Sequence, residues 1–451
     1  MKKFRIILIA AVLFCSVSVW GKTPKYVFYF IGDGMGVNQA MATELYMQSQ
    51  NMGELNFRHF PVTTFVTTFS NNATVTDSAA GGTALGSGEK VNNGAIGMRP
   101  DGTWTAPITD FAKRSGYAVG IISSDALTLA TPAAFYGHAP SRNDEEILGG
   151  QLMEADIDFA GGPSVWPPKD GGEYWSEQAR QHGYTVFTGK NAYKHGTKGK
   201  VLCLSENLKS NALQYALDND GSATSLEDIT AAAIDHLYTN SKKGFFLMAE
   251  GAQIDHAGHS QDPATGIIEI IDFSRSIDLA IQFYKQHPDE TLIVVTADHE
   301  TGYCIVKDGN ISLVKSQKCS LNRLTYLLMQ LGKDNKEVTW GQLKGLLKEQ
   351  LGFWDTVEVS REEELILSDL YKKTFIDCST DNIRDLYSSN SQLAVEAVRY
   401  LGQQAGVIYY RGSHSASPVG LYVMGSGAQE FASCKDNTDI AKTIKKLAKY
   451  K

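Results

Sequence analysis

The fold is decided by a short apolar run, Tyr26-Val27-Phe28-Tyr29-Phe30-Ile31, which ends abruptly at Gly32-Asp33-Gly34. Three more apolar runs end in the same way: Ala118 to Ile122 before Ser123-Ser124-Asp125, Phe245 to Ala249 before Glu250, and Leu292 to Ala297 before Asp298. Continuous apolar runs are typical of parallel strands that are covered on both faces. Between these runs, the segments Glu227 to Leu237 and Ile267 to Tyr284 have apolar residues three or four positions apart, as in a helix. The sequence therefore predicts an α/β fold with a mostly parallel central sheet flanked by helices on both faces.

The 451 residues divide into three kinds of segment. Residues 1–21 place basic side chains before a short apolar stretch, which is typical of a signal peptide and too short for a membrane span of about 20 residues. Cys15 would allow lipidation, but Phe14 stands where such signals have a small residue. Residues 304–406 carry Leu, Lys and Glu at helical spacing, which predicts a mostly helical insertion. We expect an α/β core of residues 22–303 and 407–451, no stable membrane span, and export to the periplasm or the extracellular space.

The charge of the chain narrows the class of partner. Lys plus Arg is 42 and Asp plus Glu is 50, a formal net charge of −8. This balance argues against nonspecific binding of nucleic acid, and an anionic substrate would need a local source of positive charge. Of the six cysteines, Cys15 would leave with the signal peptide, and the pairing of the other five stays open.

Two glycine-rich segments contain candidate functional residues. Asp33 lies between Gly32 and Gly34, which let the backbone approach a ligand closely, although a strand-end Asp also often caps the next helix. The glycine spacing is not GxGxxG, so dinucleotide binding is not supported. In the segment Val75 to Ala84, Ser78 begins an expected helix, as its cap or as a nucleophile beside the amide dipoles. Because no GxSxG elbow is present, a Ser-His-Asp hydrolase is disfavoured.

Candidate metal ligands cluster at the expected carboxyl edge of the sheet. Asp255 and His259 are four residues apart, so on a helix they share a face and can bind one ion. Glu250 suits an oxygen-preferring cation such as Mg²⁺, although chance clustering is the alternative. Two zinc-type sites and one magnesium-type site would use seven side chains: Asp33, Glu250, Asp255, His259, Asp298, His299 and His414.

In this order the segments resemble the alkaline phosphatase family, whose superfamily also contains sulfatases and phosphodiesterases. The matching motifs are Thr-Asp-Ser-Ala at 76–79, Glu-Gly-Ala-x-Ile-Asp-x-x-x-His at 250–259 and Thr-Ala-Asp-His-x-Thr-Gly at 296–302. The resemblance covers roughly Lys25 to Gly302 and His414 to the end of the chain, and leaves the insertion unmatched.

The resemblance assigns a role to each candidate residue. It implies that Ser78 is the nucleophile and that Arg142 clamps the phosphate, which a guanidinium can hold through two oxygens. The residues that it implies for the metals are Asp255, His259 and His414 for one zinc, Asp33, Asp298 and His299 for the other, and Asp33, Thr131 and Glu250 for magnesium.

Two positions depart from the well-known bacterial member of the family. Leu129 stands where that enzyme has an Asp near magnesium and animal members have a His, which puts the affinity and identity of the third metal in doubt. His256 stands where it has a Lys, as a His does in animal members, and could contact phosphate through water.

The activity implied is hydrolysis of phosphate monoesters through a phosphoserine intermediate, by a homodimer with two zinc ions and one magnesium ion. Two alternatives are an esterase for phosphate diesters or sulfate esters and an exported metal- or phosphate-binding protein without turnover. The sulfatase motifs CxPxR and SxPxR are absent around Ser78, and diesterases of the superfamily often use Thr as nucleophile. Both features favour the monoesterase.

Overall fold

A computed structural model describes residues 23–379 and 382–451. Its helices are α1 Val37–Ser49, α2 Ser78–Ser87, α3 Ile108–Arg114, α4 Ala130–Ala133, α5 Glu145–Glu154, α6 Glu173–Gln181, α7 Leu226–Asn240, α8 Gln253–His259, α9 Pro263–Gln286, α10 Leu321–Asp334, α11 Trp340–Leu351, α12 Arg361–Tyr371, α13 Gln392–Ala405 and α14 Asn437–Ala448. Its strands are β1 Tyr26–Gly32, β2 Val62–Val66, β3 Ala118–Ser123, β4 Phe159–Gly162, β5 Tyr184–Thr188, β6 Lys200–Leu204, β7 Phe245–Gly251, β8 Thr291–Thr296, β9 Glu300–Thr301, β10 Cys304–Val306, β11 Ile383–Arg384, β12 Ser389–Asn390, β13 Val407–Tyr409, β14 His414–Ser415 and β15 Val419–Gly425. The expected signal peptide lies outside the described residues.

One large sheet organises the core. Nine strands follow the order β2-β15-β8-β1-β7-β3-β4-β6-β5. The strands from β8 to β5 pair in parallel, whereas β15 is antiparallel to both β8 and β2. The prediction of a mostly parallel central sheet is thus confirmed, with one antiparallel edge. The strands β4, β5 and β6 widen the sheet on the other side of β3, and the sequence analysis did not predict them.

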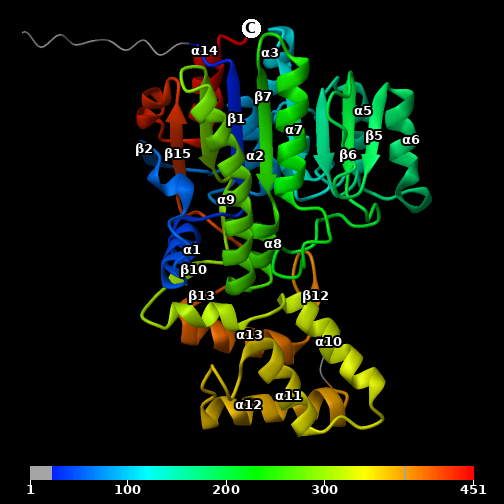
Figure 1. The fold of residues 1–451 in the computed structure, drawn as a ribbon, viewed down its shortest axis with the longest axis vertical. Coiled ribbons are helices and arrows are strands. Elements are labelled where there is room, and N and C mark those ends of the chain that lie inside the picture. The colour runs from blue at the N-terminus through cyan, green and yellow to red at the C-terminus, as the bar shows by residue number, and fades with distance from the viewer. Residues whose placement is uncertain (1–22, 380–381) are drawn as a thin grey trace, which may run out of the picture.

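Helices cover both faces of this sheet. In Figure 1, α7 and α9 lie in front of the central strands and α2 lies behind them. Between these layers, β7 and β8 are buried along their whole length, and so are Phe28, Tyr29 and Phe30 of β1. This double coverage explains why the strands are continuous apolar runs with no alternation of polar and apolar residues.

The segment after β10 forms a separate helical layer. Figure 1 shows α10, α11, α12 and α13 beyond one end of the sheet, near the short hairpin β11–β12. Their apolar side chains form a second buried cluster that includes Leu324, Leu343, Leu347, Leu367 and Leu393. β10 pairs with β13, so the strand that enters the segment and the strand that leaves it lie side by side.

Two further properties concern the helices and the cysteines of the described residues. Within residues 23–379 and 382–451, no helix combines the length and the apolar composition needed to cross a membrane. Cys203, Cys304, Cys319, Cys378 and Cys434 are all unpaired.

Candidate active site

The candidate residues meet at the carboxyl edge of the sheet. Asp33 follows β1, Glu250 lies near the end of β7, and Asp298 and His299 follow β8. Because β1, β7 and β8 are adjacent and parallel, their ends bring these side chains to one place. The helix α8 adds Asp255 and His259 on one face, as their spacing predicted, and β14 adds His414.

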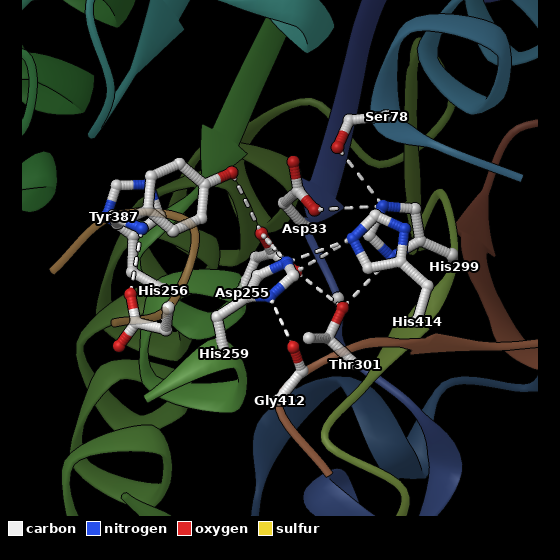
Figure 2. A network of polar contacts seen from close by, with 12 residues as sticks. Asp33, Ser78, Asp255, His256, His259, His299, Thr301, Tyr387, Gly412 and His414 are labelled. Atoms are coloured by element: carbon white, nitrogen blue, oxygen red, sulfur yellow. Dashed lines mark hydrogen bonds and ion pairs between the residues drawn. The ribbon is translucent and has the colours of Figure 1, made fainter. Parts of the chain in front are cut away.

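The first group consists of Asp255, His259 and His414, whose ligand atoms lie within 4.8 Å of one another. The Nε2 atoms of His259 and His414 are 3.1 Å apart, and His259 Nε2 is 3.4 Å from Asp255 Oδ2. The other ring nitrogens are anchored to backbone carbonyls, Nδ1 of His259 at 2.9 Å from Gly412 O and Nδ1 of His414 at 3.0 Å from Thr76 O. These bonds leave both Nε2 atoms turned toward the carboxylate (Figure 2), an arrangement that suits a tetrahedral metal ion.

The second group consists of Asp33, Asp298 and His299, and it meets the same distance criterion. His299 Nε2 lies 3.1 Å from Asp298 Oδ2 and 3.6 Å from Asp33 Oδ1. The rings of His299 and His414 stack with their centroids 3.6 Å apart, so the two groups are immediate neighbours.

The third set shares Asp33 with the second group. Thr131 Oγ1 donates to Asp33 Oδ2 at 3.2 Å, and Glu250 completes the set. Ser123 donates from its hydroxyl to Glu250 Oε2. This set consists only of oxygen atoms, the ligands that Mg²⁺ prefers.

Ser78 lies beside the second group. Its hydroxyl is 3.1 Å from His299 Nε2, and Figure 2 shows it directed toward that ring. Ser78 is the first residue of α2 and is not its cap, because Asp77 accepts the backbone N–H of Ala80 at 3.0 Å. The Ser78 hydroxyl is therefore free of a capping role. Asp33 does not cap α1 either, since the cap position is Gly36.

Arg142 reaches the same helix start. Its Nη1 lies 3.3 Å from Asp77 Oδ2, and Asp77 Oδ2 also accepts the backbone N–H of Gly94 at 3.0 Å. Asp77 therefore caps α2 and also holds the Arg142 guanidinium near the start of that helix.

Burial and mutual repulsion perturb the carboxylates. Burial, followed by the nearby Asp298, raises the pKa of Asp33 well above its ordinary value. Burial and Asp125 raise the pKa of Glu250 to about 8, and burial and Asp255 raise that of Asp298 to about 7. Asp255 differs from these residues. Burial raises its pKa, but His259 and His414 lower it, so the net shift of the pKa is downward. Several buried carboxyl groups this close together can all be ionised only when cations neutralise their charge.

Unpaired atoms support the same conclusion. Oδ1 of Asp33 is buried and has no hydrogen-bond partner among the described residues. Oδ2 of Asp298 is also buried and makes no hydrogen bond there, although His299 Nε2 lies 3.1 Å away. Buried carboxylate oxygens normally have a partner, and here each belongs to a group with metal-ligand geometry. The donor set of this chain therefore fits divalent cations.

Sequence reasoning missed three residues that touch the cluster. Tyr387, from the turn between β11 and β12, donates its hydroxyl to Asp255 Oδ2 at 3.1 Å and stacks on His256 with the ring centroids 3.6 Å apart. Thr301 donates its hydroxyl to Asp255 Oδ1, and Asp125 Oδ2 lies 3.0 Å from His256 Nε2. Thr301 belongs to the TADHxTG motif and Asp125 to a polar strand end, so both had a signal. Tyr387 had none, because its place depends on how the insertion folds back.

Comparison with known proteins shows which family the chain resembles. The family model for alkaline phosphatase matches residues 24–160 and 167–450, so it also includes the insertion 304–406, which the motifs alone left unmatched. Alkaline phosphatase 4 of Bacillus subtilis is 30% identical over 447 residues, covering 94% of this chain and 89% of its own, and the alkaline phosphatase of Escherichia coli is 27% identical over 385 residues, covering 72% and 81%.

Solved structures give the same result. A cold-active alkaline phosphatase from a psychrophilic Shewanella species superposes with a TM-score of 0.79 at 27% identity, over 94% of this chain and 99% of its own. A variant of the alkaline phosphatase from the Antarctic bacterium TAB5, solved with Mg bound in a site called M3, superposes with a TM-score of 0.67 at 25% identity, over 96% and 99%.

Proposed function

This chain belongs to the alkaline phosphatase family and is a phosphomonoesterase; on that premise we propose that it acts through a phosphoserine at Ser78 with two zinc ions and one magnesium ion. The observation that supports the proposal most is the position of the Ser78 hydroxyl, 3.1 Å from His299 in one triad of candidate ligands and next to the other triad. A nucleophile at the junction of two cation sites can meet the phosphorus of a bound ester.

The residues that would hold the cations follow from the three sets of contacts. Asp255, His259 and His414 would hold one zinc ion, and Asp33, Asp298 and His299 the other. Asp33, Thr131 and Glu250 would hold magnesium. When bound, such ions lower the pKa of a nearby hydroxyl and neutralise the charge of the phosphate oxygens.

The chain's own groups would bind and orient the ester. The first turn of α2 presents the positive end of its dipole where Ser78 lies, which favours a bound phosphate. Arg142, held by Asp77, would donate to two phosphate oxygens at once. His256, buried next to Asp255, would meet the phosphate through a water molecule.

Two displacements complete the reaction. Ser78 loses its hydroxyl proton as its oxygen attacks phosphorus, the bond to the ester oxygen breaks, and the leaving oxygen takes up one proton to give the alcohol. Water then attacks the phosphoserine, the bond to Ser78 Oγ breaks, and the serine hydroxyl is restored as inorganic phosphate leaves. Arg142 and the amides at the start of α2 would stabilise the charge on the equatorial oxygens in both steps.

Steady-state hydrolysis of an aryl phosphate tests the proposal. We expect turnover with zinc and magnesium, loss of turnover after chelation, and recovery when the metals return. Ser78→Ala should lose more than about 1,000-fold in kcat, while Ser87→Ala at the other end of α2 should retain activity. A phosphate-binding protein without turnover would hydrolyse no monoester under any metal condition. Faster hydrolysis of an aryl diester or sulfate ester would instead favour one of the related esterases.

We also propose that the chain forms a homodimer through an exposed apolar face. Phe65, Tyr303, Ile305 and Tyr410 are 38% to 63% exposed and line a groove of about 530 Å³. Clustered aromatic and aliphatic side chains are typical of protein interfaces, and a second copy of the chain would cover this one. The mass in solution should be that of two chains. Ile305→Glu should shift it to one chain, whereas Ile147→Glu, at an exposed position on α5, should not.

The remaining proposals concern the ends and the parts of the chain. Export rests on the signal-like residues 1–21, and N-terminal sequencing of the mature protein from the periplasm or medium tests it. The division into the core 22–303 and 407–451 and the insertion 304–406 is supported by the separate apolar cluster of the insertion.

A further inference from the structure

A buried carboxylate without an assigned role lies next to the third cation set. Asp125 comes two residues after β3 and is 6% exposed. Its Oδ2 is 3.0 Å from His256 Nε2, while its Oδ1 is buried and has no hydrogen-bond partner in the described part of the chain. Leaving a buried carboxylate oxygen unpaired is costly, so this atom indicates a missing positive partner or a water molecule.

The backbone places Asp125 close to Glu250. Ser123 and Glu250 are paired residues of β3 and β7, and the Ser123 hydroxyl donates to Glu250 Oε2. The same hydroxyl accepts the backbone N–H of Asp125 at 2.8 Å. The Ser123 hydroxyl therefore joins the backbone of Asp125 to the side chain of Glu250, one of the carboxylates of the third set.

Asp125 also fixes the orientation of His256. The His256 ring is held at its edge by Asp125 and on its face by Tyr387, which stacks at 3.6 Å with an angle of 17° between the rings. With Nε2 engaged by Asp125, Nδ1 is the ring nitrogen left to other partners. One carboxylate thus contacts the histidine proposed to meet the phosphate and borders the proposed magnesium set.

Leu129 makes this carboxylate important. Leu129 comes just before α4, whose Thr131 belongs to the third set together with Asp33 and Glu250. The aliphatic side chain of Leu129 can accept no hydrogen bond and has no charge. A polar partner for the third cation must then come from another position. Asp125 has a free buried oxygen and lies on the same connection between β3 and α4.

We propose that Asp125 is a positioning residue that serves the third cation site and His256 together, and that it supplies the acidic partner which Leu129 does not. The inference rests on the proposed function, since it presupposes a cation held by Asp33, Thr131 and Glu250. It adds to that function a residue outside the metal-ligand motifs. Loss of Asp125 should weaken Mg²⁺ binding and leave the two zinc sites filled.

Titration calorimetry of the zinc-loaded protein with Mg²⁺ tests the inference. Asp125→Asn keeps the shape of the side chain, and its amide oxygen can still meet His256, but the charge is lost. We expect Mg²⁺ to bind about 10- to 100-fold more weakly, as for the loss of a residue that supports metal ligands. Zinc content by elemental analysis should be unchanged, and activity lost at limiting Mg²⁺ should return at saturating Mg²⁺.

Two further variants separate this role from a structural one. Asp125→Ala also removes the partner of His256, so it should raise the dissociation constant of inorganic phosphate more than Asp125→Asn does. Asp158→Asn is the control, because Asp158 pairs with Lys113 and lies just before β4, at the opposite end of the strands. It should keep the wild-type affinity for Mg²⁺.

The outcomes distinguish the inference from the function on which it rests. If the wild-type chain hydrolyses an aryl phosphate and binds Mg²⁺, and both Asp125 variants bind Mg²⁺ as tightly, the inference alone is wrong. If the wild-type chain binds no Mg²⁺ or has no phosphatase activity, the proposed function fails with it. If one Asp125 variant unfolds at a lower temperature than the wild type, the Mg²⁺ affinity of the other variant decides the test.

Discussion

Replacing Arg142 with Ala should weaken the binding of phosphate without lowering the stability of the fold. The guanidinium lies 3.3 Å from Asp77, and the two side chains are 25% and 21% exposed, so this ion pair contributes less than about 1 kcal/mol to folding. Asp77 would not be left unpaired in Arg142→Ala, because it still accepts the backbone N–H groups of Ala80 and Gly94. The melting temperature of the variant should therefore stay near that of the wild type.

The effect of Arg142→Ala on the affinity for phosphate should be much larger than its effect on stability. A hydrogen bond to a charged partner contributes about 1.5 to 3 kcal/mol, which corresponds to a loss of about 10- to 150-fold in affinity. Inhibition by inorganic phosphate measures this loss directly. Arg142→Lys keeps the charge but loses the two-pronged geometry, so it should fall between the wild type and Arg142→Ala. Equal phosphate affinity in Arg142→Ala and the wild type would refute a role for Arg142 in binding phosphate.

Three further predictions follow from the same geometry. In the metal-free protein, folding raises the pKa of Asp298 to about 7 and the pKa of Glu250 to about 8. Between about pH 4 and 8 these two carboxyl groups therefore bind more protons in the folded state than in the unfolded state. Its melting temperature should fall as the pH rises through that window, and loading with zinc and magnesium should remove this slope in calorimetric scans. Tyr387→Phe removes a hydrogen bond to Asp255 and keeps the ring, so zinc should dissociate several-fold faster into a chelator while stacking on His256 persists. Leu343→Ala opens a cavity in the fully buried cluster of the insertion and should cost about 2 to 5 kcal/mol, seen as faster proteolysis of the insertion than of the core.

The central sheet and the meeting of several candidate residues at its edge could be predicted because these features depend on local sequence, whereas Thr131 and Arg142 entered only through the family resemblance. The strand β1 is apolar throughout because both of its faces are covered, and its end is marked by the glycines around Asp33. The pairing of Asp255 with His259 required only the helical period. In each case a few neighbouring residues contain the whole signal.

Other features could not be predicted because they depend on distant partners. The antiparallel direction of β15 is set by its pairing with β2 and β8, and nothing within its own residues distinguishes it from a parallel strand. Tyr387 lies in a segment whose residues showed only helical texture around it. The short strands β11 and β12 that hold it have two residues each, too few for a recognisable period.

The contacts of the hairpin turn explain how the insertion can bear on the chemistry of the core. Asp385 accepts the backbone N–H of Tyr387 at 2.8 Å, and Ser260, just after α8, donates its hydroxyl to Asp385 at 2.9 Å. The turn is thus tied to the end of the helix that carries Asp255 and His256, while the Tyr387 side chain contacts both of those residues. Because Tyr387 of the insertion and Asp125 of the core both contact residues of α8, we expect a shift of either one to change the spacing between Asp255 and His256. The insertion thus contributes Tyr387 to the candidate site, and we expect sequence changes around Tyr387 to alter the activity of this chain.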